Sequence, residues 1–200
     1  MAFAAAKGKV NLMTKAKTNK KPLSLTEELY DWVETFITAL VAVVLIFTFV
    51  CRIVVVDGQS MNKTLDHRDT LVISGITKAQ PGDIVVFQQL EDNFPKPLIK
   101  RVIATEGQTV DIDFETWTVT VDGQALDEPY VNYIPGKAMR SGLIQFPYTV
   151  EDGQVFVMGD NRNNSRDSRS FGAVDERNIM GKVLFRVTPV KKFGVVKPVE

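Results

Sequence analysis

The residues of this chain best suited to chemistry lie in three segments that are far apart in the sequence. Ser60 follows a Gly-Gln pair, and Lys100 lies in the apolar segment LIKRVI. Residues 158–172 read MGDNRNNSRDSRSFG, which is dense in carboxylates, guanidinium groups and hydroxyls. Such a composition can build a fixed hydrogen-bond network around a reactive group. The three segments thus offer a nucleophile, a base and a loop that supports them.

Serine attacks a carbonyl only when another group takes its hydroxyl proton. The usual base is histidine, but the single histidine, His67, lies in the charged segment LDHRD, which is typical of an exposed turn. A lysine can act instead if burial or nearby cations lower its pKa from about 10.4. The apolar neighbours of Lys100 favour such burial, and in a strand Arg101 would point to the opposite face. Taken singly, a turn serine and an exposed strand lysine remain the simpler interpretations.

The region that must position these residues, 57–200, is typical of β structure. Short segments rich in Val, Ile, Phe and Thr alternate with Pro-Gly, Glu-Gly and Asp-Gly turn signals. We find no repeat and no linker, so we predict one mainly β domain, a barrel or a sandwich. The expected strands are 70–74, 83–87, 98–105, 109–113, 116–121, 154–158 and 182–187.

Three other segments of this region carry specific expectations. Asp122-Gly123 after residues 116–121 predicts a hairpin with a two-residue turn. Residues 127–147 lack strand alternation, so we expect a surface excursion from the β core. Residues 174–180 are compatible with one or two helical turns.

The N-terminal part of the chain has a different composition. Residues 1–21 carry six lysines and no acid, which is typical of a basic tail without a core. Residues 36–56 are apolar apart from Arg52, and as a helix they would extend about 31 Å, the thickness of a bilayer core. We therefore predict a cytoplasmic tail and interfacial segment at 1–31 and a transmembrane anchor at 32–56. The lysines on the N-terminal side place residues 57–200 outside the cell membrane.

Three alternatives to the anchor remain open. The segment could be a core helix of a soluble protein, since Arg52 interrupts the apolar run, or a cleaved secretory signal, although residues 54–57 lack the small residues of a cleavage site. It could also carry a lipid on Cys51, although a lipidated cysteine normally follows a small residue and Val50 precedes this one. The lone Cys51 excludes an intrachain disulfide. The 24 basic and 24 acidic residues balance, so the charge does not point to nucleic acid, and we expect no metal and no cofactor.

The three chemical segments resemble the motifs of bacterial type I signal peptidases. Residues 60–65 are similar to the nucleophile box S-M-x-P-T-L, and residues 98–103 to the lysine box. Residues 159–172 match the third box, G-D-N-R-x-N-S-x-D-S-R-x-x-G, at every specified position, and residues 82–87 resemble the segment G-D-I-V-x-F. The third box is long and specific, whereas the other two are weak alone. The order agrees from the predicted anchor to Val187, so the resemblance covers most of the chain.

The chain departs from the family pattern at a few positions. Lys63 replaces the usual proline of the nucleophile box, and residues 104–108 (ATEGQ) replace the common G-x-P-G-D. Gly58 stands where some relatives have an oxyanion-stabilising serine. The short Gram-positive-type members of the family also have glycine at this position. Backbone N–H groups, including that of Ser60, would then stabilise the oxyanion.

The resemblance implies a membrane-anchored serine endopeptidase that removes signal peptides from exported preproteins after small residues. Ser60 would form the acyl-enzyme, and Lys100 would be the general base. Ser165 would orient the lysine amine, and the preprotein would bind as an extended strand. The supporting network would be completed by Asp167, Arg169, Asp160 and Arg162, and the shallow substrate pockets would be lined by Met61, Leu65, Leu98 and Ile99.

Two other functions fit parts of the sequence. A self-cleaving repressor-type peptidase shares the Ser/Lys arrangement but carries a soluble DNA-binding region, where this chain has a lysine tail and an apolar run. A catalytically inactive, membrane-anchored β domain could bind secreted segments. Lys63, which departs from the nucleophile box, is compatible with that alternative. The sequence does not specify the oligomeric state.

Overall fold

The structure is a computed structural model that describes residues 24–75, 78–89 and 96–196. Its first element is a long helix, α1 (Leu25–Phe49). Ser24 begins it with a capping box, because the Ser24 N–H donates to Glu27 Oε2 at 2.8 Å and Glu27 N–H donates back to Ser24 Oγ at 3.4 Å. The predicted basic tail at residues 1–21 lies outside the described residues.

Most of helix α1 is apolar and exposed. Leu25–Ile46 comprises 22 residues with a mean hydropathy of 1.8, and none of it is buried inside the protein. At about 1.5 Å per residue this segment is roughly 33 Å long. In the described part of the chain it is the one helix long and apolar enough to cross a membrane.

The predicted anchor at 32–56 required the helix to continue to residue 56, but the helix ends at Phe49. Cys51–Val55 instead forms strand β1, which pairs antiparallel with β2 (Thr70–Ser74) from Cys51↔Ser74 to Val55↔Thr70. The β-branched run IVVV at 53–56 favours a strand, because branching at Cβ restricts χ1 in a helix. The predicted C-terminal boundary of the helix was therefore wrong, and Arg52 lies in the sheet rather than at the end of the helix.

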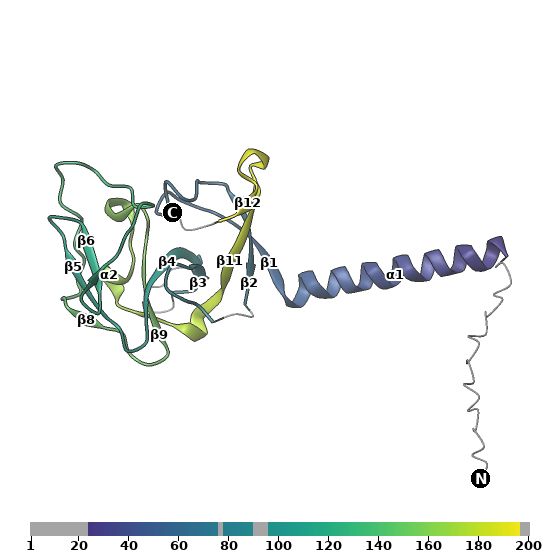
Figure 1. Ribbon diagram of the computed structural model, residues 1–200, viewed down its shortest axis with the longest axis horizontal. Coiled ribbons are helices and arrows are strands. Elements are labelled where there is room, and N and C mark those ends of the chain that lie inside the picture. Colours follow the sequence, from purple (N-terminus) through teal and green to yellow (C-terminus); the bar gives the residue numbers. More distant parts are fainter. Residues whose placement is uncertain (1–23, 76–77, 90–95, 197–200) are drawn as a thin grey trace, which may run out of the picture. The chain divides into compact units, whose positions relative to one another are not determined.

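The larger sheet holds eight strands in the described residues, all antiparallel, in the order β1-β2-β11-β3-β4-β9-β10 with β12 beside β11 (Figure 1). Strand β11 is long and bulged, so that one half pairs with β3 and the other with β2. Gly181 at this crossing has no room for a side chain, since a Cβ there would lie 2.9 Å from the Ser74 carbonyl. The remaining strands of this sheet are β3 (Ile84–Phe87), β4 (Leu98–Thr105), β9 (Gln154–Met158), β10 (Val174–Asp175), β11 (Ile179–Thr188) and β12 (Gly194–Val195).

The smaller sheet has the order β7-β6-β5-β8. Its β6–β7 hairpin confirms the predicted two-residue turn, and Asp122 and Gly123 have φ values of 50° and 77°, as a type I′ turn requires. Its strands are β5 (Thr109–Asp113), β6 (Thr118–Val121), β7 (Gln124–Ala125) and β8 (Tyr148–Thr149).

Short helical turns connect the strands. One of the one or two helical turns expected at 174–180 is formed, the 3-10 turn η2 (Glu176–Asn178), and strand β10 precedes it. The other turns are η1 (Arg162–Asn164), α2 (Ser168–Phe171) and η3 (Val190–Lys192).

Three apolar clusters fill the β domain and cover both faces of the central strands. In β3, Ile84 and Val86 face one cluster with Met61 of the nucleophile segment, while Val85 and Phe87 face another with strand β9. The third cluster packs the smaller sheet on β4 and β9. Because its strands are buried on both faces, the centre of the larger sheet is a rigid base for side chains at the ends of β1 and β4. The prediction of a mainly β domain preceded by an apolar helix is confirmed.

Candidate active site

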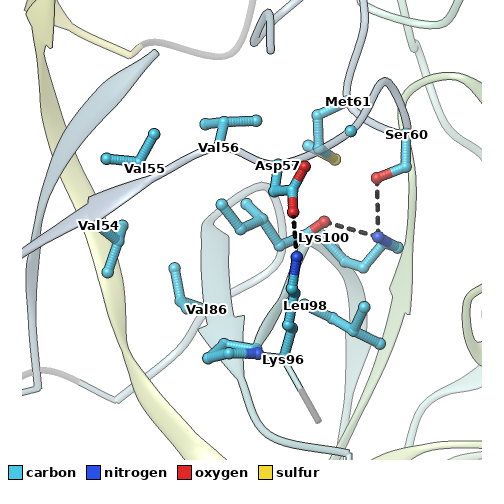
Figure 2. A pocket seen from close by; sticks show the side chains of 13 residues that line it. Val54, Val55, Val56, Asp57, Ser60, Met61, Val86, Lys96, Leu98 and Lys100 are labelled. Atoms are coloured by element: carbon cyan, nitrogen blue, oxygen red, sulfur yellow. Dashed lines mark hydrogen bonds and ion pairs between the residues drawn. The ribbon is translucent and has the colours of Figure 1, made fainter. Parts of the chain in front are cut away.

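Ser60 and Lys100, forty residues apart in sequence, are in direct contact (Figure 2). Ser60 lies in the loop that follows β1, and Lys100 is the third residue of β4. The Nζ of Lys100 lies 2.9 Å from Ser60 Oγ and donates to the carbonyl of Ile99 at 2.8 Å. The structure thus brings together the predicted nucleophile and base at hydrogen-bonding distance.

The environment of Lys100 favours its neutral form. The residue is only 2% exposed, and burial lowers the pKa of its amine to about 8. The carboxylates of Asp167 and Asp160 act in the opposite direction, and the Arg169 guanidinium assists burial. At pH 7 about a tenth of such an amine is neutral, far more than for an exposed lysine. The amine can therefore accept a proton from Ser60 across the existing contact.

Residues 159–172, the third box, hold the loop that carries Ser60 through hydrogen bonds to its backbone. The backbone N–H of Asn161 donates to the Ser60 carbonyl at 2.9 Å, and its side-chain amide donates to the Gln59 carbonyl at 3.1 Å. Gly159 lies directly against the same loop, because a Cβ there would come within 2.6 Å of the Ser60 carbonyl oxygen and 2.3 Å of Ser165 Oγ. A glycine at 159 is therefore a packing requirement of this site.

Asp160 links the nucleophile loop to the strand of Lys100. Its carboxylate accepts from Thr64 Oγ1 at 2.5 Å and, at 2.9 and 2.7 Å, from two nitrogens of Arg101. The Arg101 guanidinium also donates to the Gly82 carbonyl and lies under the ring of Tyr130, 3.9 Å from its centroid. Arg101 thus points away from Lys100 into a buried network, as strand alternation predicted.

Arg162 joins this network to residues 127–147. Its guanidinium pairs with Glu128 at 2.5 Å and donates to the Gly159 carbonyl, while the Tyr130 hydroxyl donates to Glu128 at 2.9 Å. Burial and the Glu128 carboxylate raise the pKa of the Tyr130 hydroxyl. Residues 127–147 are mostly exposed, as expected of a surface excursion, but the segment also buries Tyr130 and supplies Glu128 to this network. Sequence reasoning missed Glu128 and Tyr130, although an acid and an aromatic two residues apart in a polar loop were a usable signal.

Asp167 and Arg169 form the second buried pair. Their bidentate contact measures 2.8 Å at both ends, and Asp167 also accepts the Gly159 N–H at 2.9 Å. Burial acts to raise the pKa of the Asp167 carboxyl, but the Arg169 guanidinium and the Gly159 N–H outweigh it and hold that pKa below its ordinary value. Arg169 further donates to the carbonyls of Arg140 and Arg162. The pair therefore fixes the fold of the third box.

Ser165 lies in the same box, but the contact predicted with the lysine amine is not formed. Its Oγ is buried and makes no hydrogen bond to Lys100 Nζ, while its hydroxyl helps to lower the pKa of the Asp167 carboxyl. The hydrogen bonds of Lys100 Nζ go to Ser60 and Ile99.

Arg186 and Asp69 are two further site residues that sequence reasoning missed. Arg186, on β11, donates to the Thr64 carbonyl, and its Nε lies 3.2 Å from the buried Asp69 carboxylate. Asp69 in turn accepts the Asp66 N–H at 2.9 Å. The neighbouring Lys63 is exposed, so the lysine that replaces the family proline points away from this network. A lone arginine in an apolar strand segment was the signal for Arg186.

A groove of about 370 Å³ leads to Ser60 and Lys100 (Figure 2). Residues 54–58 form one wall and residues 96–100 the other, with Val86 and Met61 between them. Leu98 and Ile99 line it as predicted, but Leu65 is fully buried in the core beside Met61 and does not. Within residues 24–75, 78–89 and 96–196, no cluster of three or more His, Cys, Asp or Glu could hold a metal.

Comparison with known proteins identifies the family. The sequence model of the family described as "Signal peptidase, peptidase S26" matches residues 29–188. The chain is 39% identical over 166 residues to "Probable signal peptidase I-1" of Synechocystis sp., which covers 78% of this chain and 81% of that protein. It is 35% identical to "Probable signal peptidase I-2" of the same organism, over 90% of this chain and 83% of that protein. It is 31% identical to "Signal peptidase IB" of Staphylococcus aureus, over 84% of this chain and 94% of that protein. On these matches, and with a buried lysine beside its candidate serine, the chain belongs to the peptidase S26 family of signal peptidases, which are serine endopeptidases.

Proposed function

We propose that this protein cleaves signal peptides from exported preproteins after small residues, with Ser60 as nucleophile and Lys100 as general base. The observation that carries the proposal is the 2.9 Å contact between Lys100 Nζ and Ser60 Oγ at the end of an apolar groove. No metal and no cofactor take part in the proposed reaction.

In the first half of the reaction the neutral Lys100 amine takes the Ser60 hydroxyl proton while Oγ attacks the scissile carbonyl. The tetrahedral intermediate then collapses to an acyl-enzyme, and the lysine ammonium gives its proton to the leaving amine. In the second half the neutral amine takes a proton from water, whose oxygen attacks the ester. Collapse of this second intermediate frees the signal peptide and returns the proton to Ser60 Oγ.

The groove suits an extended, mostly apolar segment. Strand β9 pairs with β4 only from Arg101 onward, so the outer edge of Leu98–Lys100 has no strand partner in the described part of the chain. β1 is likewise an edge strand of the larger sheet. An extended peptide can therefore add backbone hydrogen bonds along these edges while small side chains enter the groove. Met61, Leu98, Ile99 and Val86 leave room for small apolar side chains next to the cut.

We further propose that α1 anchors the protein in the cell membrane, with the N-terminus in the cytoplasm and the β domain outside. The length and hydropathy of Leu25–Ile46 support the anchor, and the lysines of residues 1–21 support its orientation. A site held at the outer surface would meet the cleavage region of a translocated signal.

Cleavage of a preprotein by the detergent-solubilised protein tests the proposal. We expect two products whose masses place the cut after a small residue, and no cleavage by Ser60→Ala or Lys100→Ala. Equal cleavage by Ser60→Ala would remove the serine from its assigned role. Binding of the preprotein without cleavage by the unmodified protein would favour the inactive binding domain. Cleavage of the chain itself, with the preprotein untouched, would favour a repressor-type peptidase.

A further inference from the structure

An ion pair connects the two walls of the groove. Asp57 Oδ2 lies 2.7 Å from Lys96 Nζ, and both residues line the groove, Asp57 just after β1 and Lys96 just before β4 (Figure 2). The two side chains are 61% and 72% exposed. Each lowers the electrostatic energy of the other, since the pKa of Asp57 is lowered and that of Lys96 raised mainly by their mutual hydrogen bond. We call this pair the groove bridge.

The groove bridge lies in the path proposed for the substrate. Figure 2 draws it between the valines of β1 and the Ser60–Lys100 contact, with the apolar groove residues around it. A peptide that follows the open edge of Leu98–Lys100 toward Ser60 runs between the same two walls. The peptide and a closed bridge therefore compete for one space.

We propose that the groove bridge is a specificity determinant that must open before an extended preprotein segment can reach Ser60. This inference rests on the proposed function. A segment without charged side chains offers Asp57 and Lys96 no new partner, so it bears the full cost of separating them. A segment with a suitably placed charge replaces part of the lost pairing.

Among the described residues, His67 and Lys100 are the other titratable groups that contact Asp57 or line the groove. His67 Nδ1 lies 3.7 Å from Asp57 Oδ1 and accepts the Gly58 N–H at 3.2 Å. Lys100 lies deeper in the same groove. All measurements are made at one fixed pH, so that only the charges of the bridge are varied.

The first test measures cleavage of a peptide that spans a signal cleavage site and has no charged side chain near the cut. We expect Lys96→Gln and Asp57→Asn each to lower KM about two- to five-fold with unchanged kcat, because exposed pairs contribute little. The double variant should lower KM no further than either single variant, and the swap Asp57→Lys with Lys96→Asp should restore the original KM. Raising salt from about 0.05 to 1 M should lower KM for the unmodified protein and leave it constant for the double variant.

A matched control separates the bridge from a general charge effect. Lys78 is an exposed lysine paired with Glu106 at 3.0 Å, and it does not line the groove. Lys78→Gln removes the same charge from the surface and should leave KM unchanged. A KM that falls as much in Lys78→Gln as in Lys96→Gln would overturn the proposal, as would a KM that rises or stays constant in both bridge variants.

A second measurement tests the bridge independently of catalysis. In a Ser60→Ala background, the Kd of the same peptide labelled with a fluorophore is measured by anisotropy, with and without Lys96→Gln. We expect Lys96→Gln to tighten binding by the same two- to five-fold. A Kd that stays unchanged or increases would overturn the proposed role of the groove bridge, even if the protein is an active peptidase. A lower Kd in Lys96→Gln, together with no cleavage by the unmodified protein, would instead overturn the proposed function and support the role of the groove bridge in peptide binding.

Discussion

Thr64 Oγ1 donates a 2.5 Å hydrogen bond to Asp160 Oδ2, and this contact couples the positions of the candidate nucleophile and base. Thr64 lies in the loop of Ser60, while Asp160 holds Arg101, the residue after Lys100, through two hydrogen bonds. One buried carboxylate therefore fixes both the loop that carries the serine and the strand that carries the lysine. Arg186 holds the same loop from its other side through the Thr64 carbonyl.

Replacing Thr64 by valine removes this hydroxyl and keeps the volume of the side chain. Asp160 would lose one buried, charge-assisted partner, so we expect unfolding free energy to fall by about 1–3 kcal/mol. Because the loop of Ser60 loosens, kcat should fall roughly tenfold, equivalent to about 1.4 kcal/mol in the barrier. KM should stay nearly constant, since Thr64 does not line the groove.

Urea unfolding and steady-state kinetics of purified Thr64→Val measure both effects. Thr64→Ser is the matched control, because it keeps the hydroxyl and loses only a methyl group. A Thr64→Val protein with unchanged kcat would show that Asp160 holds the lysine strand without positioning the serine.

Asp167 is assigned a structural pairing with Arg169 rather than a role in proton transfer. Asp167→Ala leaves a buried guanidinium without its carboxylate and removes an acceptor from the Gly159 N–H. Breaking one side of a buried pair typically costs about 3–5 kcal/mol, so we expect a marked drop in Tm together with loss of activity. Full activity with an unchanged melting temperature would refute the assignment.

The same pair predicts how stability depends on acid. The pKa of Asp167 is lowered in the folded protein. Its contribution to stability is therefore complete above the unfolded value of about 3.9 and is lost as the pH falls through the lower folded value. Unfolding free energy measured from about pH 6 to 2 should decline more steeply for the unmodified protein than for Asp167→Asn, and equal slopes would contradict this.

The sequence predicted the strands better than the connections between them. Strands 70–74, 98–105, 109–113 and 154–158 agree with the structure residue for residue, because turn signals bound short β-branched runs. Strand β1 was missed because a continuous apolar segment has no periodicity that shows where a helix ends and a strand begins. Its identity depends on a partner, β2, that lies about twenty residues further along the chain.

The site was predicted only where a motif is local. Residues 159–172 are contiguous, so the matched box located Asp160, Arg162, Asp167 and Arg169 together. Arg186 meets the Thr64 carbonyl from 122 residues away, and Glu128 meets Arg162 from 34 residues away. No periodicity relates such pairs, because their contacts follow from the order of strands in the sheet. Leu65 was assigned to the groove by resemblance, but it packs in the core against apolar residues of the neighbouring strands.

The orientation of the anchor can be tested in intact cells. The lysine-rich residues 1–21 and the apolar helix predict that the β domain faces outward. Protease added outside spheroplasts should digest the β domain and spare an epitope placed within residues 1–21. Protection of the β domain while the epitope is lost would reverse the orientation and contradict a role in export.

The last prediction concerns Lys100, on which the proposed mechanism depends. Burial lowers its pKa to about 8, so kcat/KM should rise tenfold per pH unit below that value and level off above it. Lys100→Arg should be inactive at every pH, because a guanidinium stays protonated. His67→Ala is the control. His67 is half exposed and contacts the Gly58 N–H, so its loss should leave the pH profile in place.

The same lowered pKa predicts that Lys100 destabilises the fold at neutral pH. Below pH 8 both folded and unfolded chains bind the proton, and the folded chain bears the whole penalty of the buried charge. Between about pH 8 and 10.5 the unfolded chain binds more protons, so stability should rise across that window. A shift from 10.5 to about 8 corresponds to roughly 3 kcal/mol, an upper bound because Lys100→Met also loses the bonds to Ser60 and Ile99.

Lys100→Met should therefore be inactive and yet melt several degrees higher than the unmodified protein at pH 7, with the difference shrinking toward pH 10. Thermal unfolding of both proteins across this range measures the effect. A Lys100→Met protein that is less stable at pH 7 would mean that the lysine is charged and well paired in the folded state. If, in addition, cleavage survived Lys100→Ala and was abolished by His67→Ala in folded protein, the base would be the histidine and the Ser/Lys assignment would be wrong.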